Sequence, residues 1–160
     1  MLRGLRLVLL ILACLPSASA AAPAALAPAR DLAADARELR ARKAVMLVLF
    51  SQADCHWCER VKAEFLLPLQ KEHPARQRIL LREVALDGDA GLRDFDGRAT
   101  TQRRFAAAAG ARLAPTLAVY GPDGRQLADP IVGFRLADFY AEYVNRAVER
   151  YVAIPREDFL

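Results

Sequence analysis

The pattern of apolar and polar positions places a strand and a helix on either side of one short motif. The apolar run from Ala44 to Phe50 has the length and composition of a strand that is covered on both faces. After a polar stretch, Val61, Phe65 and Leu69 recur every four residues, as on the core-facing side of a helix. The motif Cys55-His56-Trp57-Cys58 lies between the two patterns. It is therefore predicted to sit at a strand-to-helix junction.

Further helices and strands are predicted on both sides of this junction. Asp31 can cap a helix that ends near Lys43, and Leu32, Ala36 and Leu39 share one face of it. Crossover helices imply parallel strands and a tight turn implies an antiparallel pair, so an α/β fold with helices on both faces of one sheet is expected. Beyond the central helix, the patterns predict a strand over residues 78–86, a polar surface loop over 87–98, a helix over 100–109, two strands joined by the turn 121–124, and a final helix from residue 136.

Acidic residues in the polar loop raise the alternative of a calcium site. The carboxylates would come from Asp87, Asp89, Asp94 and Asp96, with Glu83 just before them. Their spacing does not fit the usual calcium loop, and no Glu completes it. We therefore expect a solvated loop and no metal site.

The N-terminal residues have the three-part layout of a secretory signal peptide. Arg3 and Arg6 precede an apolar run from Leu7 to Leu15, and the small residues Ala18-Ser19-Ala20 follow. The run is shorter than the ~20 residues that a membrane span needs, so we expect cleavage after Ala20, export to the periplasm or another exported location, and no stable membrane insertion afterwards. The alternative is a lipid anchor at Cys14, because the residues before it resemble a lipobox. The predicted organisation is a signal peptide (1–20), a flexible Ala/Pro leader (21–30) and one domain (31–160).

Composition and charge restrict the function. The chain has 160 residues, of which 54% are hydrophobic, enough for the core of one domain. Cleavage removes Arg3 and Arg6, which lowers the formal net charge of +4 by two. The sequence contains neither a Lys/Arg block nor a basic stripe interleaved with aromatic residues, so we expect no nucleic-acid partner.

The two cysteines of the motif are the main candidates for chemistry. A helix N-terminus stabilises an anion, so a thiol there ionises more easily than a free one, and Cys55 is nearest the exposed end. Two cysteines separated by two residues on a first helical turn can close a disulfide and reopen it when another thiol attacks. After cleavage Cys55 and Cys58 are the only cysteines left, and in an exported protein a single close pair favours chemistry over stapling.

Other uses of the pair remain as alternatives. A structural disulfide is one, and half of a zinc site is another. A structural zinc site needs about four ligands, and beyond the pair the chain offers only Cys14, His56 and His73. Haem attachment would require a His directly after the second cysteine, where Glu59 stands.

Several features together resemble the thioredoxin-like disulfide oxidoreductases, most closely the bacterial periplasmic members. The similarity extends over about residues 31–152. The features that carry it are the strand VMLVLF, the motif Cys55-His56-Trp57-Cys58, Pro68 within the following helix, Ala114-Pro115-Thr116 before a strand, the turn Gly121-Pro122-Asp123-Gly124, and Val132-Gly133-Phe134 before the last helix.

The resemblance implies a thioredoxin-like α/β fold, with a central mixed sheet of about four strands and helices on both faces. It also implies that Cys55 is the nucleophile, Cys58 the resolving thiol, and Pro115 a cis proline that faces the pair. The redox-active Cys55–Cys58 disulfide would then replace any cofactor. The backbone at Ala114 would pair with an extended substrate, and Gly133 and Phe134 would contribute to substrate binding.

The sequence departs from thioredoxin itself at two places. Leu49 stands where thioredoxins carry a buried Asp on the central strand, so this proton acceptor is missing. The residues between the cysteines are His56 and Trp57. A protonated His56 would stabilise the Cys55 thiolate, and Trp57 is expected to form an apolar platform for substrate. Glu59 and Lys62 are expected to be solvated helix charges.

We therefore predict an exported thiol-disulfide oxidoreductase that reduces disulfides in exported proteins and draws electrons from a membrane donor. The opposite direction, a net oxidant, is the alternative, because a protonated His56 beside Cys55 would raise the reduction potential. The main alternative is a thiolate module on the same fold that binds or delivers copper(I) or zinc. Its weakness is ligand supply, because Met46 is the only methionine after export and lies inside the predicted strand. A silent adaptor, whose cysteines do not exchange, is a third interpretation.

Overall fold

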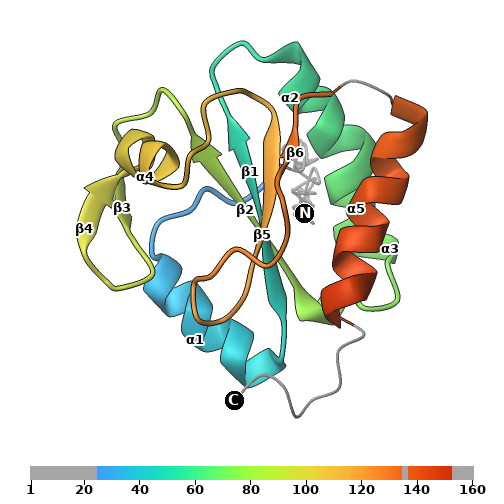
Figure 1. Cartoon of the computed structure of the whole chain (residues 1–160), viewed down its shortest axis with the longest axis horizontal. Helices are drawn as coiled ribbons and strands as arrows, with labels where there is room; N and C mark the ends of the chain where they lie inside the picture. Colours follow the sequence, from blue (N-terminus) through green and yellow to red (C-terminus); the bar gives the residue numbers. More distant parts are fainter. Residues whose placement is uncertain (1–24, 135–136, 153–160) are drawn as a thin grey trace, which may run out of the picture.

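The computed structural model describes residues 25–134 and 137–152. The predicted signal peptide, with Cys14, and residues 153–160 lie outside the described residues. The described part is built around one sheet in the order β2-β1-β5-β6 (Figure 1). β1 is parallel to β2 and antiparallel to β5, and β6 is antiparallel to β5. This confirms the predicted mixed sheet of four strands, which are β1 (Val45–Ser51), β2 (Ile79–Ala85), β5 (Thr116–Tyr120) and β6 (Ile131–Val132).

Helices cover both faces of this sheet, as predicted (Figure 1). One face packs against α1 (Leu32–Arg42) and α4 (Gln102–Ala108). The other packs against a long helical segment and α5 (Ala137–Val152). The long segment runs through α2 (His56–Val61), a π-helical turn (Lys62–Leu66) and α3 (Leu67–Glu72), and a short 3-10 turn (Arg76–Arg78) leads from it into β2.

The central strand explains why there are two cores. Every residue of β1 is buried, and successive side chains point to opposite faces. Leu47 and Leu49 join the core under the long helical segment, while Met46 and Phe50 join the core under α1 and α4. Each fully buried large apolar side chain contributes roughly 1.5–3 kcal/mol, so this strand anchors both layers.

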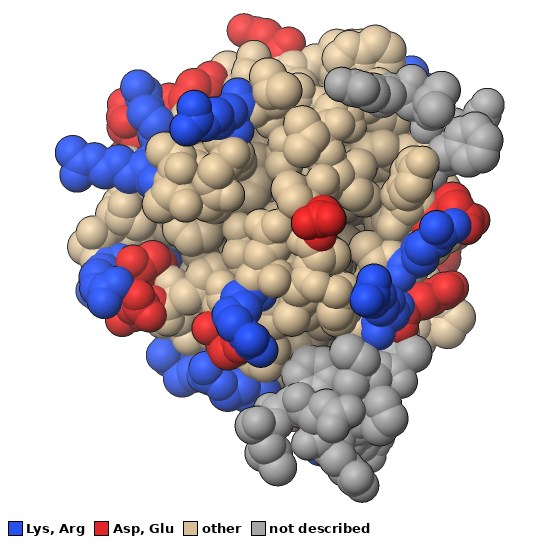
Figure 2. Space-filling view, viewed as in Figure 1, with Lys and Arg blue, Asp and Glu red and all other residues tan. Residues whose placement is uncertain are grey.

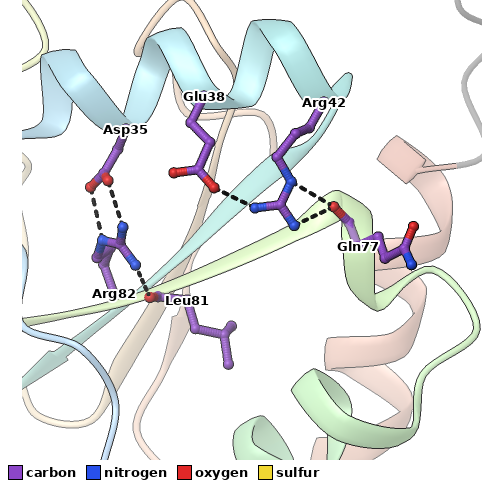
Figure 3. Close-up of polar contacts among 6 residues, drawn as sticks. All are labelled: Asp35, Glu38, Arg42, Gln77, Leu81 and Arg82. Carbon is purple, nitrogen blue, oxygen red and sulfur yellow. Dashed lines mark hydrogen bonds and ion pairs between the residues drawn. The ribbon is translucent and has the colours of Figure 1, made fainter.

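α1 is closed at both ends by local hydrogen bonds. The Asp31 carboxylate accepts a hydrogen bond from the Ala34 N–H at 2.8 Å, and Lys43 ends the helix in the left-handed conformation. This confirms the predicted cap and end. On the inner side of the helix, Asp35 forms a two-pronged ion pair with Arg82 of β2, and near its end Arg42 reaches the Gln77 carbonyl (Figure 3).

The helical segment after the cysteines is distorted just before Pro68. The Leu67 N–H bonds to the Lys62 carbonyl, which is a π-type hydrogen bond. Pro68 has no N–H to continue the regular ladder, which accounts for the irregular turn just before it.

Three regions differ from the sequence-based expectations. Residues 25–30, expected to be flexible, lie along the free edge of β2, where Leu26 and Ala29 are buried, so the packed part of the chain begins before residue 31. Residues 91–101, expected to be a loop that leads into a helix at residue 100, form a hairpin of β3 (Gly91–Arg93) and β4 (Ala99–Thr101), and α4 begins only at Gln102. The connection through α4 leads to an antiparallel strand, β5, although a crossover helix suggested a parallel one.

A search of the described residues finds no helix long and apolar enough to cross a membrane.

Candidate active site

The cysteine pair lies at the strand-to-helix junction, as predicted. Cys55 is the N-cap of α2, and its Sγ accepts a hydrogen bond from the Cys58 N–H at 3.1 Å. The two residues form a disulfide with an S–S distance of 2.08 Å and a Cα–Cα distance of 5.2 Å. Cys55 is partly exposed, whereas Cys58 is only 1% exposed. Cys55 is therefore the more accessible of the two cysteines, and Cys58 is enclosed.

The residues between the cysteines begin an aromatic surface beside the disulfide. Trp57 is 47% exposed, and its ring lies 5.3 Å from the Phe134 ring. The Arg60 guanidinium lies over both rings, 5.4 Å from the centroid of Trp57 and 5.0 Å from that of Phe134. His56 is exposed, and its ring meets Trp57 edge-on at 5.3 Å. The structure thus brings together Trp57 and Phe134, two of the predicted substrate-binding residues.

Arg60 is held in this position by Glu64 one turn later. Its guanidinium donates to both carboxylate oxygens, at 2.8 Å and 3.0 Å. The hydrogen bond and the opposite charge keep the pKa of Arg60 above its ordinary value and that of Glu64 below it. The sequence analysis did not single out Arg60, although its spacing of four residues from Glu64 is typical of a helical ion pair.

The Ala114–Pro115 peptide bond is cis, which confirms that prediction. The register of β1 and β5 pairs Phe50 with Thr116, so this bond lies at the sheet edge from which β1 leads toward Cys55. Pro115 is buried and Ala114 is partly buried. The Gly133 N–H donates to the Pro115 carbonyl at 2.7 Å, so these two predicted site residues are in direct contact.

A charged cluster lies under the active-site helix. The register pairs Leu49 with Glu83, and the Glu83 Oε1 accepts hydrogen bonds from Ser51 Oγ at 2.7 Å and Lys62 Nζ at 3.1 Å. Lys62 also contacts Glu59, at 2.6 Å. Burial works against the charged form of Lys62, but the hydrogen bonds to Glu59 and Glu83 outweigh it and raise the pKa of Lys62.

These positions correct one sequence-based expectation. The side chain of Lys62 is only 14% exposed, so it is not a solvated charge, whereas Glu59 is 70% exposed as expected. Glu83 lies in β2, within the predicted strand, and bonds to Lys62. Within the described residues, no group of three or more His, Cys, Asp or Glu side chains is arranged to hold a metal ion. Met46 is fully buried on the sheet face opposite the long helical segment.

Charges on the described surface are mixed in sign. On the face shown in Figure 2, Lys and Arg side chains gather with Asp and Glu around the rim, and the middle is largely uncharged. This face therefore presents no broad patch of one sign among the described residues.

Comparisons with known proteins agree with this geometry. The profile of the thioredoxin-like domain family matches residues 32–147, and the chain therefore belongs to the thioredoxin-like family. No curated protein matches the sequence detectably.

Solved structures show the same fold. Trxlp from Edwardsiella tarda is 22% identical, with a TM-score of 0.52 over 74% of this chain and 97% of that chain. The protein described as DsbH oxidoreductase is 17% identical, with a TM-score of 0.56 over 82% of this chain and 88% of its own. Mitochondrial thioredoxin 3 from Saccharomyces cerevisiae, in the oxidised form, is 13% identical, with a TM-score of 0.52 over 78% of this chain and 94% of its own. With the Cys55–Cys58 disulfide at the helix start, the family and the fold identify a thiol-disulfide oxidoreductase.

Proposed function

We propose that the protein is exported and reduces disulfide bonds in other exported proteins. The observation that carries the exchange chemistry of this proposal is the unequal exposure of Cys55 and Cys58 at the start of α2. Cys55 can meet a substrate disulfide. Cys58 is shielded from external disulfides and reacts only with the Cys55 sulfur of the mixed disulfide.

The reaction then has two exchange steps. The Cys55 thiolate attacks one sulfur of the substrate disulfide, a bond forms between them, and the other substrate sulfur leaves as a thiolate. Cys58 next attacks the Cys55 sulfur, which closes the Cys55–Cys58 disulfide and releases the second substrate sulfur. Two electrons pass from the dithiol to the substrate, and no further cofactor is required.

Substrate binding is assigned to the surface around the partly exposed Cys55. Trp57 and Phe134 offer adjoining aromatic rings to an apolar side chain of the substrate. Ala114, at the same sheet edge, offers its backbone to an extended substrate segment, and Gly133 holds the adjacent loop through its bond to Pro115. His56 is assigned the stabilisation of the Cys55 thiolate.

A membrane protein is proposed as the electron donor. In an oxidising compartment a dithiol stays reduced only if a reductant keeps supplying electrons. The N-terminal sequence supports export to the periplasm, since it has the basic, apolar and small-residue regions of a signal peptide. Mass spectrometry of the exported protein should find Ala21 at the N-terminus. A lipid-modified Cys14 would instead support the anchored alternative.

Trapping of mixed disulfides tests the function and the roles of the two cysteines. Cys58→Ser should accumulate covalent complexes with exported proteins, because the second step is blocked. Cys55→Ser is the matched control and should accumulate none. Equal trapping by both variants would contradict the assignment, and the absence of complexes with either would contradict the function.

A further inference from the structure

The buried position of Cys58 poses a problem for the second exchange step. In the reduced protein this thiol must lose its proton before it can attack the Cys55 sulfur. Burial disfavours the charged thiolate, and Cys58 is almost fully enclosed. Leu49, on the strand beneath, is buried and cannot accept a proton. Without another base in the site, only solvent can take this proton.

Glu83 is a residue of β2 whose carboxylate lies on the face of the sheet that the active-site helix covers. Side chains alternate along β2, so Glu83 shares a face with Ile79 and Leu81, which pack in the core under the active-site helix. Its side chain is 20% exposed, so water can still reach it. Ser51 and Lys62 bond to Oε1, and no described hydrogen bond uses Oε2.

The backbone of Glu83 is held from both sides. β1 pairs with it at Leu49. On the other side, the Ala29 N–H donates to the Glu83 carbonyl at 2.8 Å, and the Glu83 N–H donates to the Ala27 carbonyl at 3.0 Å. The N-terminal segment thus covers the outer side of β2 at Glu83 and fixes the backbone that carries this carboxylate.

Lys62 connects this carboxylate to the turn that carries Cys58. The Lys62 N–H donates to the Cys58 carbonyl, so the two residues lie one turn apart on the same side of the helix. Helical side chains lean toward the helix N-terminus, and Lys62 Nζ accordingly contacts Glu59, which follows Cys58 in the chain. The ammonium group therefore lies along the Cys58 turn while it holds Glu83.

We propose that Glu83 accepts the Cys58 proton through a bridging water, and that Lys62 and Ser51 are positioning residues for its carboxylate. This inference rests on the proposed function. The proton moves from the Cys58 thiol toward Glu83, the Cys58–Cys55 S–S bond forms, and the bond between Cys55 and the substrate sulfur breaks. The substrate leaves as a thiolate that takes a proton from solvent, and Glu83 returns its proton to solvent.

The test measures the two exchange steps separately in the intact reduced protein. An aromatic disulfide that releases a coloured thiolate is added in equal amount. The first release reports attack by Cys55, and the second, first-order release reports attack by Cys58. In Glu83→Gln the second release should slow by at least about tenfold at neutral pH, and the first should change by less than about twofold. Glu83→Asp keeps the carboxylate and should restore part of the rate.

The pH dependence separates proton transfer from a structural effect. With Glu83 as acceptor, the second rate of the unmodified protein should vary little around neutral pH. In Glu83→Gln it should rise roughly tenfold per pH unit toward the thiol range, because only solvent then removes the proton. The unmodified protein supplies this test even if the variant fails to fold.

Asp35→Asn is the matched control, because Asp35 forms a similarly buried ion pair with Arg82 on the opposite face of the sheet. It should leave both releases unchanged. An unmodified protein whose second rate already rises tenfold per pH unit, a Glu83→Gln variant with an unaltered second step, or an equal effect of Asp35→Asn would each overturn the inference. Failure of the unmodified protein to release any thiolate would instead contradict the proposed function.

Discussion

The Gly133 N–H donates to the Pro115 carbonyl at 2.7 Å, which ties the residue after β6 to the proline loop before β5. Gly133 makes this bond with a φ of 76°, a left-handed conformation that side chains with a Cβ disfavour. The loop before the last helix and the proline loop therefore depend on each other at the sheet edge from which β1 leads to Cys55.

Gly133→Ala is expected to lower the free energy of unfolding by about 1 kcal/mol. The cause is backbone strain alone, because a Cβ at this position would meet no other atom within 4 Å. Urea unfolding measures the change. Gly91→Ala is the control, since Gly91 is equally open but has no positive φ, and it should leave the stability unchanged or raise it slightly. Equal stability of the two variants would contradict this explanation.

Trp57→Ala is expected to lower kcat/KM for protein disulfides by about tenfold, since half of a large aromatic platform is lost, and to change the rate with a small disulfide much less. Tyr143→Ala is the matched control, because Tyr143 is 49% exposed on α5 and Trp57 is 47% exposed. Steady-state rates with both kinds of substrate measure the difference. An equal loss with both substrates would show that Trp57 acts on the cysteines and not on substrate binding.

Asp35→Ala should lower the free energy of unfolding by about 2–3 kcal/mol, because it leaves Arg82 partly buried without its carboxylate. The pair is two-pronged, with nitrogen–oxygen distances of 2.6 Å and 2.9 Å (Figure 3). Glu38→Ala on the same helix breaks a more exposed pair with Arg42 and should cost about 0.5 kcal/mol or less. Denaturant titration of both variants measures the two costs. Similar losses would mean that burial does not set the strength of the Asp35 pair.

Deprotonation of Tyr120 should lower the free energy of unfolding at alkaline pH. Burial raises its pKa from the ordinary 10.0 to about 12. The folded state thus binds the phenol proton more tightly than the unfolded state. This contribution is complete below about pH 10 and is lost as the pH rises toward about 12, up to about 2–3 kcal/mol. Urea midpoints of the oxidised protein across this range should fall less steeply in Tyr120→Phe. The same slope in both proteins would remove Tyr120 as a cause.

Features set by local pattern could be predicted from the sequence. β1 is apolar at every position because it is covered on both faces, and Asp31 stands where the first helix needs a cap. The position of Cys55 at the start of α2 follows from the change of period on either side of the motif. The cis bond before Pro115 followed from the family resemblance.

Features set by distant pairing could not be predicted. The composition of residues 25–30 suggests flexibility, but their backbone pairs with the free edge of β2, which only the fold creates. Glu83 precedes a run of acidic residues in sequence, and only the β1–β2 register places it beside Leu49. The position of Lys62 in the helical pattern is that of an exposed residue. In the fold its side chain reaches Glu83 of the sheet and is only 14% exposed. These contacts join residues far apart in sequence.

The reduction potential, and the effect of His56 on it, test the proposed direction of the reaction. A protonated imidazole beside Cys55 would stabilise the thiolate and hence the reduced form, which raises the reduction potential. We expect a potential between about −270 mV, the value of thioredoxin, and about −120 mV, the value of a strong oxidant. His56→Ala should lower it by about 30 mV, equivalent to a tenfold change in the equilibrium with glutathione.

His73→Ala is the matched control for His56→Ala, because His73 lies at the far end of the same helical segment, after α3, and its Nδ1 accepts a hydrogen bond from the Ala75 N–H. It should leave the potential unchanged. An ultraviolet titration of the thiolate should show, in parallel, that Cys55 loses its proton at higher pH in His56→Ala than in the unmodified protein. Identical titrations would remove His56 from the mechanism. A potential of the unmodified protein near the oxidant value would reverse the proposed direction, because such a disulfide takes electrons from its partners instead of supplying them.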